Sequence, residues 1–112
     1  MLKLARSVLE GLGYRVIVAM NGCDALEAGR LHRGAIDLLL TDVVMPAMGG
    51  RELSKKLGQA RPGLRTVFAS GYTAEAVIWH GVLERGEAFL RKPFTRTELA
   101  KKVRATLDGP RP

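Results

Sequence analysis

The sequence predicts an α/β fold in which a doubly wound parallel sheet carries helices on both faces. Amphipathic stretches alternate with short apolar runs along the chain. The run at residues 36–41 is almost entirely apolar, which is typical of a strand buried on both faces of a parallel sheet. Strands that alternate with helices also imply crossover connections, and these place helices on both sides of the sheet.

Length and composition fit one domain over residues 1–112. The chain has 46% hydrophobic and 26% charged residues, which is ordinary for a folded domain and excludes a disordered chain. Its apolar runs are far too short to span a membrane. Cys23 is the single cysteine, so no internal disulfide can form, and a reducing cytoplasm is the expected location.

Four strands and five helices are expected, and the chain opens with a helix. Ala5, Val8, Leu9 and Leu12 recur at helical spacing and predict a helix at residues 2–12. Residues 14–19 are rich in Val and Ile and are predicted to form a strand. The other strands are expected at residues 36–41, 65–70 and 88–91, and the other helices at residues 21–33, through Leu53 and Leu57 to about 60, at 73–84, and behind a Thr95–Glu98 capping box.

Three polar residues follow successive predicted strands. They are Asp42, Ser70 and Lys92. Ligands of an open parallel sheet bind beyond the carboxyl ends of its strands, so we expect these side chains to share one edge. Asp42 could attack phosphorus and form an acyl phosphate. Lys92 could neutralise the charge of the phosphoryl group, and Ser70 could donate a hydrogen bond to one of its oxygens.

Three stretches resemble the receiver domain of bacterial two-component response regulators. They are residues 37–50, 66–73 and 86–94, which contain the motifs TDVVMP (41–46), ASGYT (69–73) and FLRKPF (89–94). The resemblance covers essentially the whole chain and is strongest to the receivers attached to hybrid sensor histidine kinases. It implies a flavodoxin-like fold, a phosphoacceptor signalling domain rather than an enzyme, and a histidine kinase or phosphotransfer protein as partner.

The resemblance also implies a role for individual residues. Asp42 falls on the phosphoryl-accepting aspartate, Ser70 on the switch hydroxyl and Phe89 on the switch aromatic residue. Lys92 belongs to a lysine–proline–phenylalanine motif whose peptide bond before proline is typically cis.

Two further positions flank the path of water to the phosphoryl group in the family. They are Val44 and Tyr72, and neither is a carboxylate or an amide, so we expect that neither orients an attacking water well and that both add bulk. A long-lived acyl phosphate is therefore expected.

The sequence departs from the family at its beginning. Family members start with a strand ending in two acidic residues that help to hold Mg²⁺, and this chain, aligned on its first helix, shows no such strand. Only Asp42 and the backbone carbonyl of Val44 are then expected as Mg²⁺ ligands, so binding should be weak.

The strand that the sequence lacks is the central one in the family's sheet, of order 2-1-3-4-5. Its loss leaves unpaired edges on the predicted strands at residues 14–19 and 36–41. These two strands could pair directly in a monomer, or two chains could share strands or helices across a two-fold axis. We expect the homodimer, because direct closure would force a close-packed core to rearrange.

Other function classes fit less well or stay open. A phosphorylation-independent pseudo-receiver, acting as an interaction or dimerisation module, is the alternative. An aspartyl-phosphate hydrolase is disfavoured because Val43 and Val44 follow Asp42, which leaves no second carboxylate as acid or base. The net charge is +7, yet nucleic acid is disfavoured as a partner because no aromatic residues interleave with the basic ones.

Overall fold

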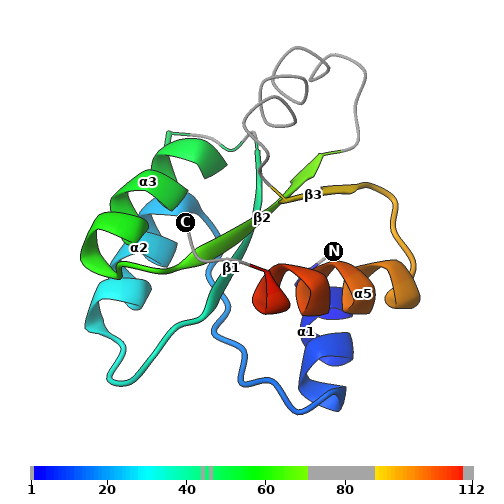
Figure 1. Cartoon of the computed structure of the whole chain (residues 1–112). Coiled ribbons are helices and arrows are strands. Elements are labelled where there is room, and N and C mark those ends of the chain that lie inside the picture. Colours follow the sequence, from blue (N-terminus) through cyan, green and yellow to red (C-terminus); the bar gives the residue numbers. More distant parts are fainter. Residues whose placement is uncertain (1, 44, 46, 71–87, 110–112) are drawn as a thin grey trace.

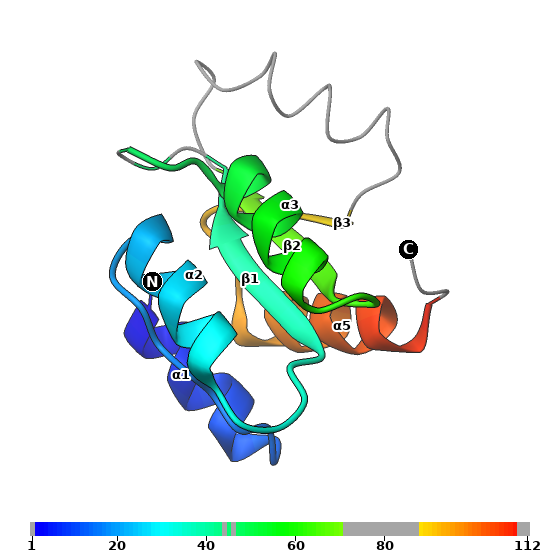
Figure 2. The ribbon, with the colours of Figure 1, turned by 90° about the vertical axis from the view of Figure 1, so that its left-hand side faces the viewer.

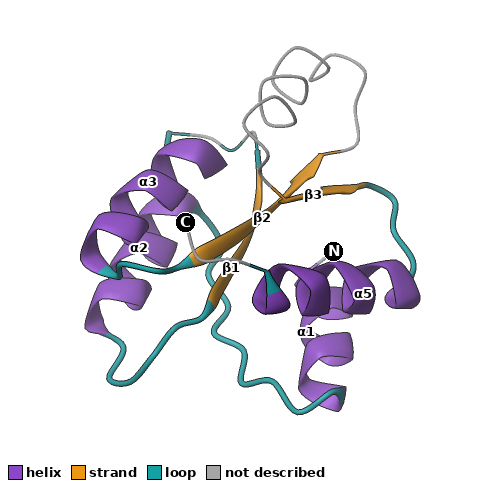
Figure 3. Ribbon diagram, viewed as in Figure 1, coloured by secondary structure: helices purple, strands orange, loops and turns teal. Residues whose placement is uncertain are grey.

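A parallel sheet forms the centre of the molecule. The computed structural model describes residues 2–43, 45, 47–70 and 88–109. Within these residues the sheet has the order β1 (Leu38–Asp42), β2 (Arg65–Ser70), β3 (Ala88–Arg91), and every pair is parallel (Figures 1 and 3). The predicted α/β class and three of the predicted strands are confirmed.

Four helices flank the sheet in the described part of the chain. They are α1 (Leu2–Gly11), α2 (Gly22–Leu31), α3 (Gly50–Ala60) and α5 (Arg96–Asp108). The expected capping box is present, since the Thr95 hydroxyl accepts from the Glu98 N–H and the Glu98 carboxylate accepts from the Thr95 N–H. The helix predicted at residues 73–84 lies outside the described residues. Every described helix is too short or too polar to cross a membrane.

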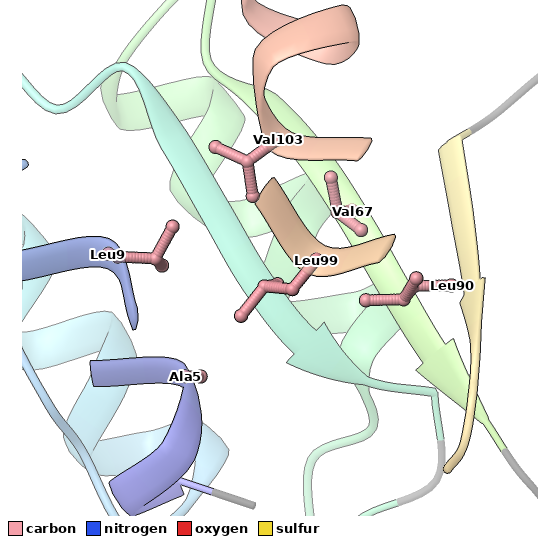
Figure 4. Packing of buried hydrophobic residues seen from close by; sticks show 6 residues of the cluster. All are labelled: Ala5, Leu9, Val67, Leu90, Leu99 and Val103. Atoms are coloured by element: carbon pink, nitrogen blue, oxygen red, sulfur yellow. The ribbon is translucent and has the colours of Figure 1, made fainter. Parts of the chain in front are cut away.

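The helices form two layers, one on each face of the sheet, with α2 and α3 on the left and α1 and α5 on the right in Figure 1, whereas Figure 2 is viewed from the α2–α3 side. α1 and α5 enclose one buried cluster, in which Leu99 and Val103 meet Leu9, Val67 and Leu90 (Figure 4). On the other face α2 and α3 enclose a second cluster, which includes Leu26, Met48, Leu53, Leu57 and Leu64. The two clusters fix the sheet between the layers, because each face of it is covered by apolar side chains.

The strand predicted at residues 14–19 is wrong. This segment connects α1 to α2 without regular secondary structure, so it does not pair with β1 either. Its Val and Ile content favours a strand, but a strand is stabilised mainly by hydrogen bonds and packing against a neighbouring strand. No described strand lies beside residues 14–19, and Ile17 and Val18 are left 49% and 39% exposed.

Arg61 joins the two helices of the second layer. Its guanidinium donates to the carbonyl oxygens of Gly29 (2.7 Å), His32 (2.6 Å) and Gly34 (2.7 Å), at and just beyond the end of α2. The last carbonyls of a helix have no partner within the helix itself, and here a side chain at the end of α3 satisfies them. Gly29 also allows close packing, since a Cβ there would lie 2.7 Å from Leu57 Cδ1.

Replacing Arg61 with Met should lower the free energy of unfolding by about 2 kcal/mol, because charged hydrogen bonds to these carbonyls are lost. Urea denaturation measures the change. Lys55→Met is the matched control, since Lys55 is exposed on the same helix and its loss should change stability little. Equal destabilisation by the two variants would contradict a specific role for Arg61.

Candidate functional site

The carboxyl ends of the strands bring the predicted site residues to one edge of the sheet. Asp42 ends β1 and lies opposite Ala69, while Ser70 ends β2 and lies opposite Arg91. Lys92 follows directly after β3. The side chain of Ser70 lies outside the described part of the structure.

Asp42 and Lys92 form an ion pair. Lys92 Nζ lies 2.6 Å from Asp42 Oδ1, and the two side chains are 29% and 30% exposed. The same Oδ1 atom is buried and accepts no well-aligned hydrogen bond from the described residues. The ammonium charge is therefore what balances this carboxylate, and the pair is close enough to be effective despite its poor hydrogen-bond alignment.

This arrangement suits a nucleophilic carboxylate. Asp42 stays partly exposed, so a reactant can reach it from solvent. An ammonium beside the nucleophile can attract an anionic reactant and then hold the negative charge that the reaction adds. The geometry thus supports the acyl phosphate chemistry predicted from the order of residues.

The loop after Asp42 is held by contacts that the sequence analysis missed. Val43 N–H donates to Ala69 O (3.1 Å), and Gly50 N–H donates to Val43 O (2.9 Å). The Thr41 hydroxyl, buried, donates to the carbonyl oxygen of Asp42 (3.0 Å). Gly50 itself packs so closely that a Cβ at this position would overlap the Asp42 carbonyl oxygen. A glycine at the first residue of a helix after a buried strand is a signal of such close approach, and it could have identified Gly50 from the sequence.

Phe89 lies in a small buried cluster at the same end of the sheet. It is 8% exposed and packs with Phe68 and Val43, which are 0% and 5% exposed. The Arg51 guanidinium carbon lies 6.0 Å from the centroid of the Phe68 ring, at the limit of a cation–π contact. The sequence singled out Phe89, whereas Phe68 and Arg51 emerge only from the packing.

Two of the remaining predicted positions cannot be placed, and one predicted feature of the backbone is present. Val44 and Tyr72 lie outside the described residues. The peptide bond between Lys92 and Pro93 is cis, as the lysine–proline–phenylalanine motif led us to expect.

Comparisons with known proteins match this arrangement to one family. The sequence pattern of the response regulator receiver domain matches residues 1–104. The sensor kinase CckA of Brucella abortus (strain 2308) is 35% identical over 100 residues, which cover 89% of this chain and 11% of that protein. The response regulator receiver protein CpdR of the same organism is 36% identical over 99 residues, which cover 88% of this chain and 81% of CpdR. The chain thus spans about a tenth of the first relative and about four fifths of the second.

Solved structures agree with the fold. The receiver domain from the hybrid histidine kinase CckA has a TM-score of 0.75 at 31% identity, with 95% of this chain and 88% of that one covered. A response regulator receiver domain protein from Clostridium thermocellum has a TM-score of 0.83, covering 96% of this chain and 85% of that one. Its identity is 21%, so it supports the fold alone.

The described residues do not fit a Mg²⁺ site, although receiver domains generally bind Mg²⁺ at the phosphorylation site. Mg²⁺ requires several oxygen ligands in near-octahedral geometry. In the part of the chain that the structure describes, no three His, Cys, Asp or Glu side chains gather where a metal could bind. Asp42 supplies one carboxylate, and Lys92 already lies against one of its oxygens.

A methyl group at Gly50 should disturb the site. Gly50→Ala would drive a Cβ into the Asp42 carbonyl oxygen, so the end of β1 and the start of α3 must separate, at a cost of about 1–3 kcal/mol. The change is measured by denaturation, together with the NMR shift of the Asp42 carboxylate.

Gly58→Ala is the matched control in the same helix. A Cβ at Gly58 meets nothing within 4 Å, so this variant should gain about 1 kcal/mol from helix propensity. Equal effects of the two substitutions would show that Gly50 does not hold the loop.

Proposed function

The chain belongs to the response regulator receiver domains, and from this premise we propose that residues 1–112 form one receiver that accepts a phosphoryl group on Asp42. Receiver domains are signalling domains of two-component systems and not classical enzymes. The observation that carries the proposal is the 2.6 Å ion pair between Asp42 and Lys92 at the carboxyl edge of the sheet.

The phosphoryl donor is a phosphohistidine on a histidine kinase or phosphotransfer protein. A carboxylate oxygen of Asp42 forms the new bond to phosphorus as the bond from phosphorus to the imidazole nitrogen breaks. The electron pair of that bond stays on the imidazole, which takes up a proton from solvent. Lys92 then pairs with a phosphoryl oxygen in place of the carboxylate it contacts now.

Ser70 and Phe89 convert the modification into a change of surface. In this proposal the Ser70 hydroxyl donates to another phosphoryl oxygen, and Phe89 changes its position in the cluster with Phe68 and Val43. A close-packed cluster repacks between discrete arrangements, so a small movement at Asp42 is passed on rather than absorbed. The surface formed by β3 and α5 then changes its affinity for a partner.

The proposal includes a cellular location and an oligomeric state. The phosphoryl exchange takes place in the cytoplasm, and the receiver acts as a homodimer. Membrane and nucleic acid are not among its partners. The hybrid kinase relative supports a histidine kinase as the donor, since its own name couples a kinase to a receiver.

One observation favours a second candidate. The carboxylates of the described residues do not gather into a Mg²⁺ site. A pseudo-receiver that works without phosphorylation needs no such site. Such a module would use the same fold for protein interaction or dimerisation. The two candidates differ in whether Asp42 is ever modified.

Asp42→Asn should abolish phosphorylation, because the amide lacks a nucleophilic oxygen anion. The parent chain and the variant are incubated with acetyl phosphate and Mg²⁺, and intact-mass spectrometry counts the phosphoryl groups. Asp37→Asn is the control, since Asp37 is exposed before the other end of the same strand. Labelling of the Asp42→Asn variant at the parent rate would refute the assignment, and a parent chain that never labels would favour the pseudo-receiver.

The acyl phosphate should persist, because neither Val44 nor Tyr72 is a carboxylate or an amide that would orient an attacking water, and both side chains add bulk. Val44→Asn should shorten its lifetime several-fold by orienting that water. Ala47→Asn adds the same amide to the same loop, and Ala47 has a positive φ of 65° that Asn tolerates. Decay of the phosphorylated chain is followed by mass spectrometry. An unchanged lifetime in Val44→Asn would show that water reaches the phosphorus without help.

A further inference from the structure

Arg51 is a charged residue near the functional edge that the proposed function does not use. It lies in the first turn of α3, directly after Gly50, whose backbone packs against the Asp42 carbonyl oxygen. Figure 2 shows α3 lying along β1 and β2, the strands that end at Asp42 and Ser70. The helix dipole disfavours a cation in this first turn, so the guanidinium gains most from a negative charge nearby.

The guanidinium of Arg51 lies over an aromatic cluster. Its central carbon is 6.0 Å from the centroid of the Phe68 ring. Phe68 is fully buried and packs with Phe89 and Val43, so these side chains have little room to move independently. In the register of the sheet Phe68 lies opposite Thr41, the residue before the phosphoacceptor. The arginine therefore contacts the cluster that holds the proposed switch residue.

Phosphorylation would change the charge balance of this edge. Lys92 Nζ lies 2.6 Å from Asp42 Oδ1 and balances a single negative charge. A phosphoryl group carries a charge of about −1.5 to −2 at neutral pH, which is more than one ammonium balances. A cation–π contact at 6.0 Å is at the limit of its range, whereas attraction between full charges acts over longer distances. The added charge should therefore draw the Arg51 guanidinium away from the ring.

We propose that Arg51 is a positioning residue that responds to the charge on Asp42 and passes this response to the aromatic cluster. With Asp42 unmodified, the guanidinium lies over Phe68 and holds the cluster in its present packing. With Asp42 phosphorylated, the guanidinium turns toward the phosphoryl group, and Phe68 and Phe89 repack. The inference rests on the proposed function and adds to it a second cation besides Lys92, supplied by α3.

Fluorine NMR of the full chain tests this coupling. The sequence has three phenylalanines, so labelling with fluorophenylalanine gives three resonances, which Phe68→Leu and Phe94→Leu variants assign. In the parent chain the Phe68 and Phe89 resonances should both shift when acetyl phosphate and Mg²⁺ are added. In Arg51→Gln the Phe68 resonance should be displaced beforehand, and its shift on phosphorylation should be at least two-fold smaller.

Three further variants separate the charge of Arg51 from its packing. Arg51→Lys keeps a cation and should recover most of the shift, which a purely structural role would not predict. Lys55→Gln is the matched control, because it removes one exposed positive charge from the same helix and should behave like the parent chain. Circular dichroism shows whether each variant is folded. If Arg51→Gln does not fold, Arg51→Met takes its place, since it keeps an apolar stem over the ring.

Intact-mass spectrometry measures the phosphorylated fraction, so that shifts are compared at equal labelling. Equal shifts in the parent chain and in Arg51→Gln would overturn the inference and leave Asp42 as the phosphoacceptor. An equally reduced shift in Lys55→Gln would overturn it too, because any positive charge on α3 would then suffice. A parent chain that never takes up a phosphoryl group would refute the proposed function and this inference together.

Discussion

The parallel register of the three strands is the constraint on which the rest of the structure depends. Because β1, β2 and β3 run in the same direction, their ends form a single edge that holds Asp42, Ser70 and Lys92. Helical crossovers follow from the same parallel pairing and place apolar layers on both faces. The chemistry of the edge and the two buried clusters are therefore two consequences of one hydrogen-bonding pattern.

The site combines a charge on a long side chain, the ammonium of Lys92, with a backbone that hydrogen bonds hold around Asp42. The ammonium of Lys92 sits on a flexible stem and can exchange one anionic oxygen for another. The carboxylate it contacts is fixed more firmly, since Thr41, Ala69 and Gly50 hold the backbone around Asp42. Such a division suits a site that must accept a charged group without losing its geometry.

The sequence was most informative where a pattern is decided locally. The apolar run at residues 36–41 and the spacing of Thr95 and Glu98 depend on neighbours along the chain, and both predictions hold. Asp42 and Lys92 could be brought together because strand order alone determines which edge they share. Residues 14–19 could not be assigned correctly, because strand formation there requires a partner that composition does not reveal. Gly50 and Arg61 were missed for a related reason, since their importance lies in atoms that are distant along the chain.

The hydrogen bonds from Arg61 to the end of α2 have a mechanical consequence. α3 begins against the carbonyl of Asp42, and Arg61, the residue directly after its end, holds the last turn of α2 through its guanidinium. A helix is stiff along its axis, and the 11 residues of α3 span about 16 Å. The two helices are thus coupled, and the amino end of α3 lies against the carbonyl of Asp42. A tilt of α3 that starts at Asp42 would therefore move α2 as well, because Arg61 joins the two helices at their other ends.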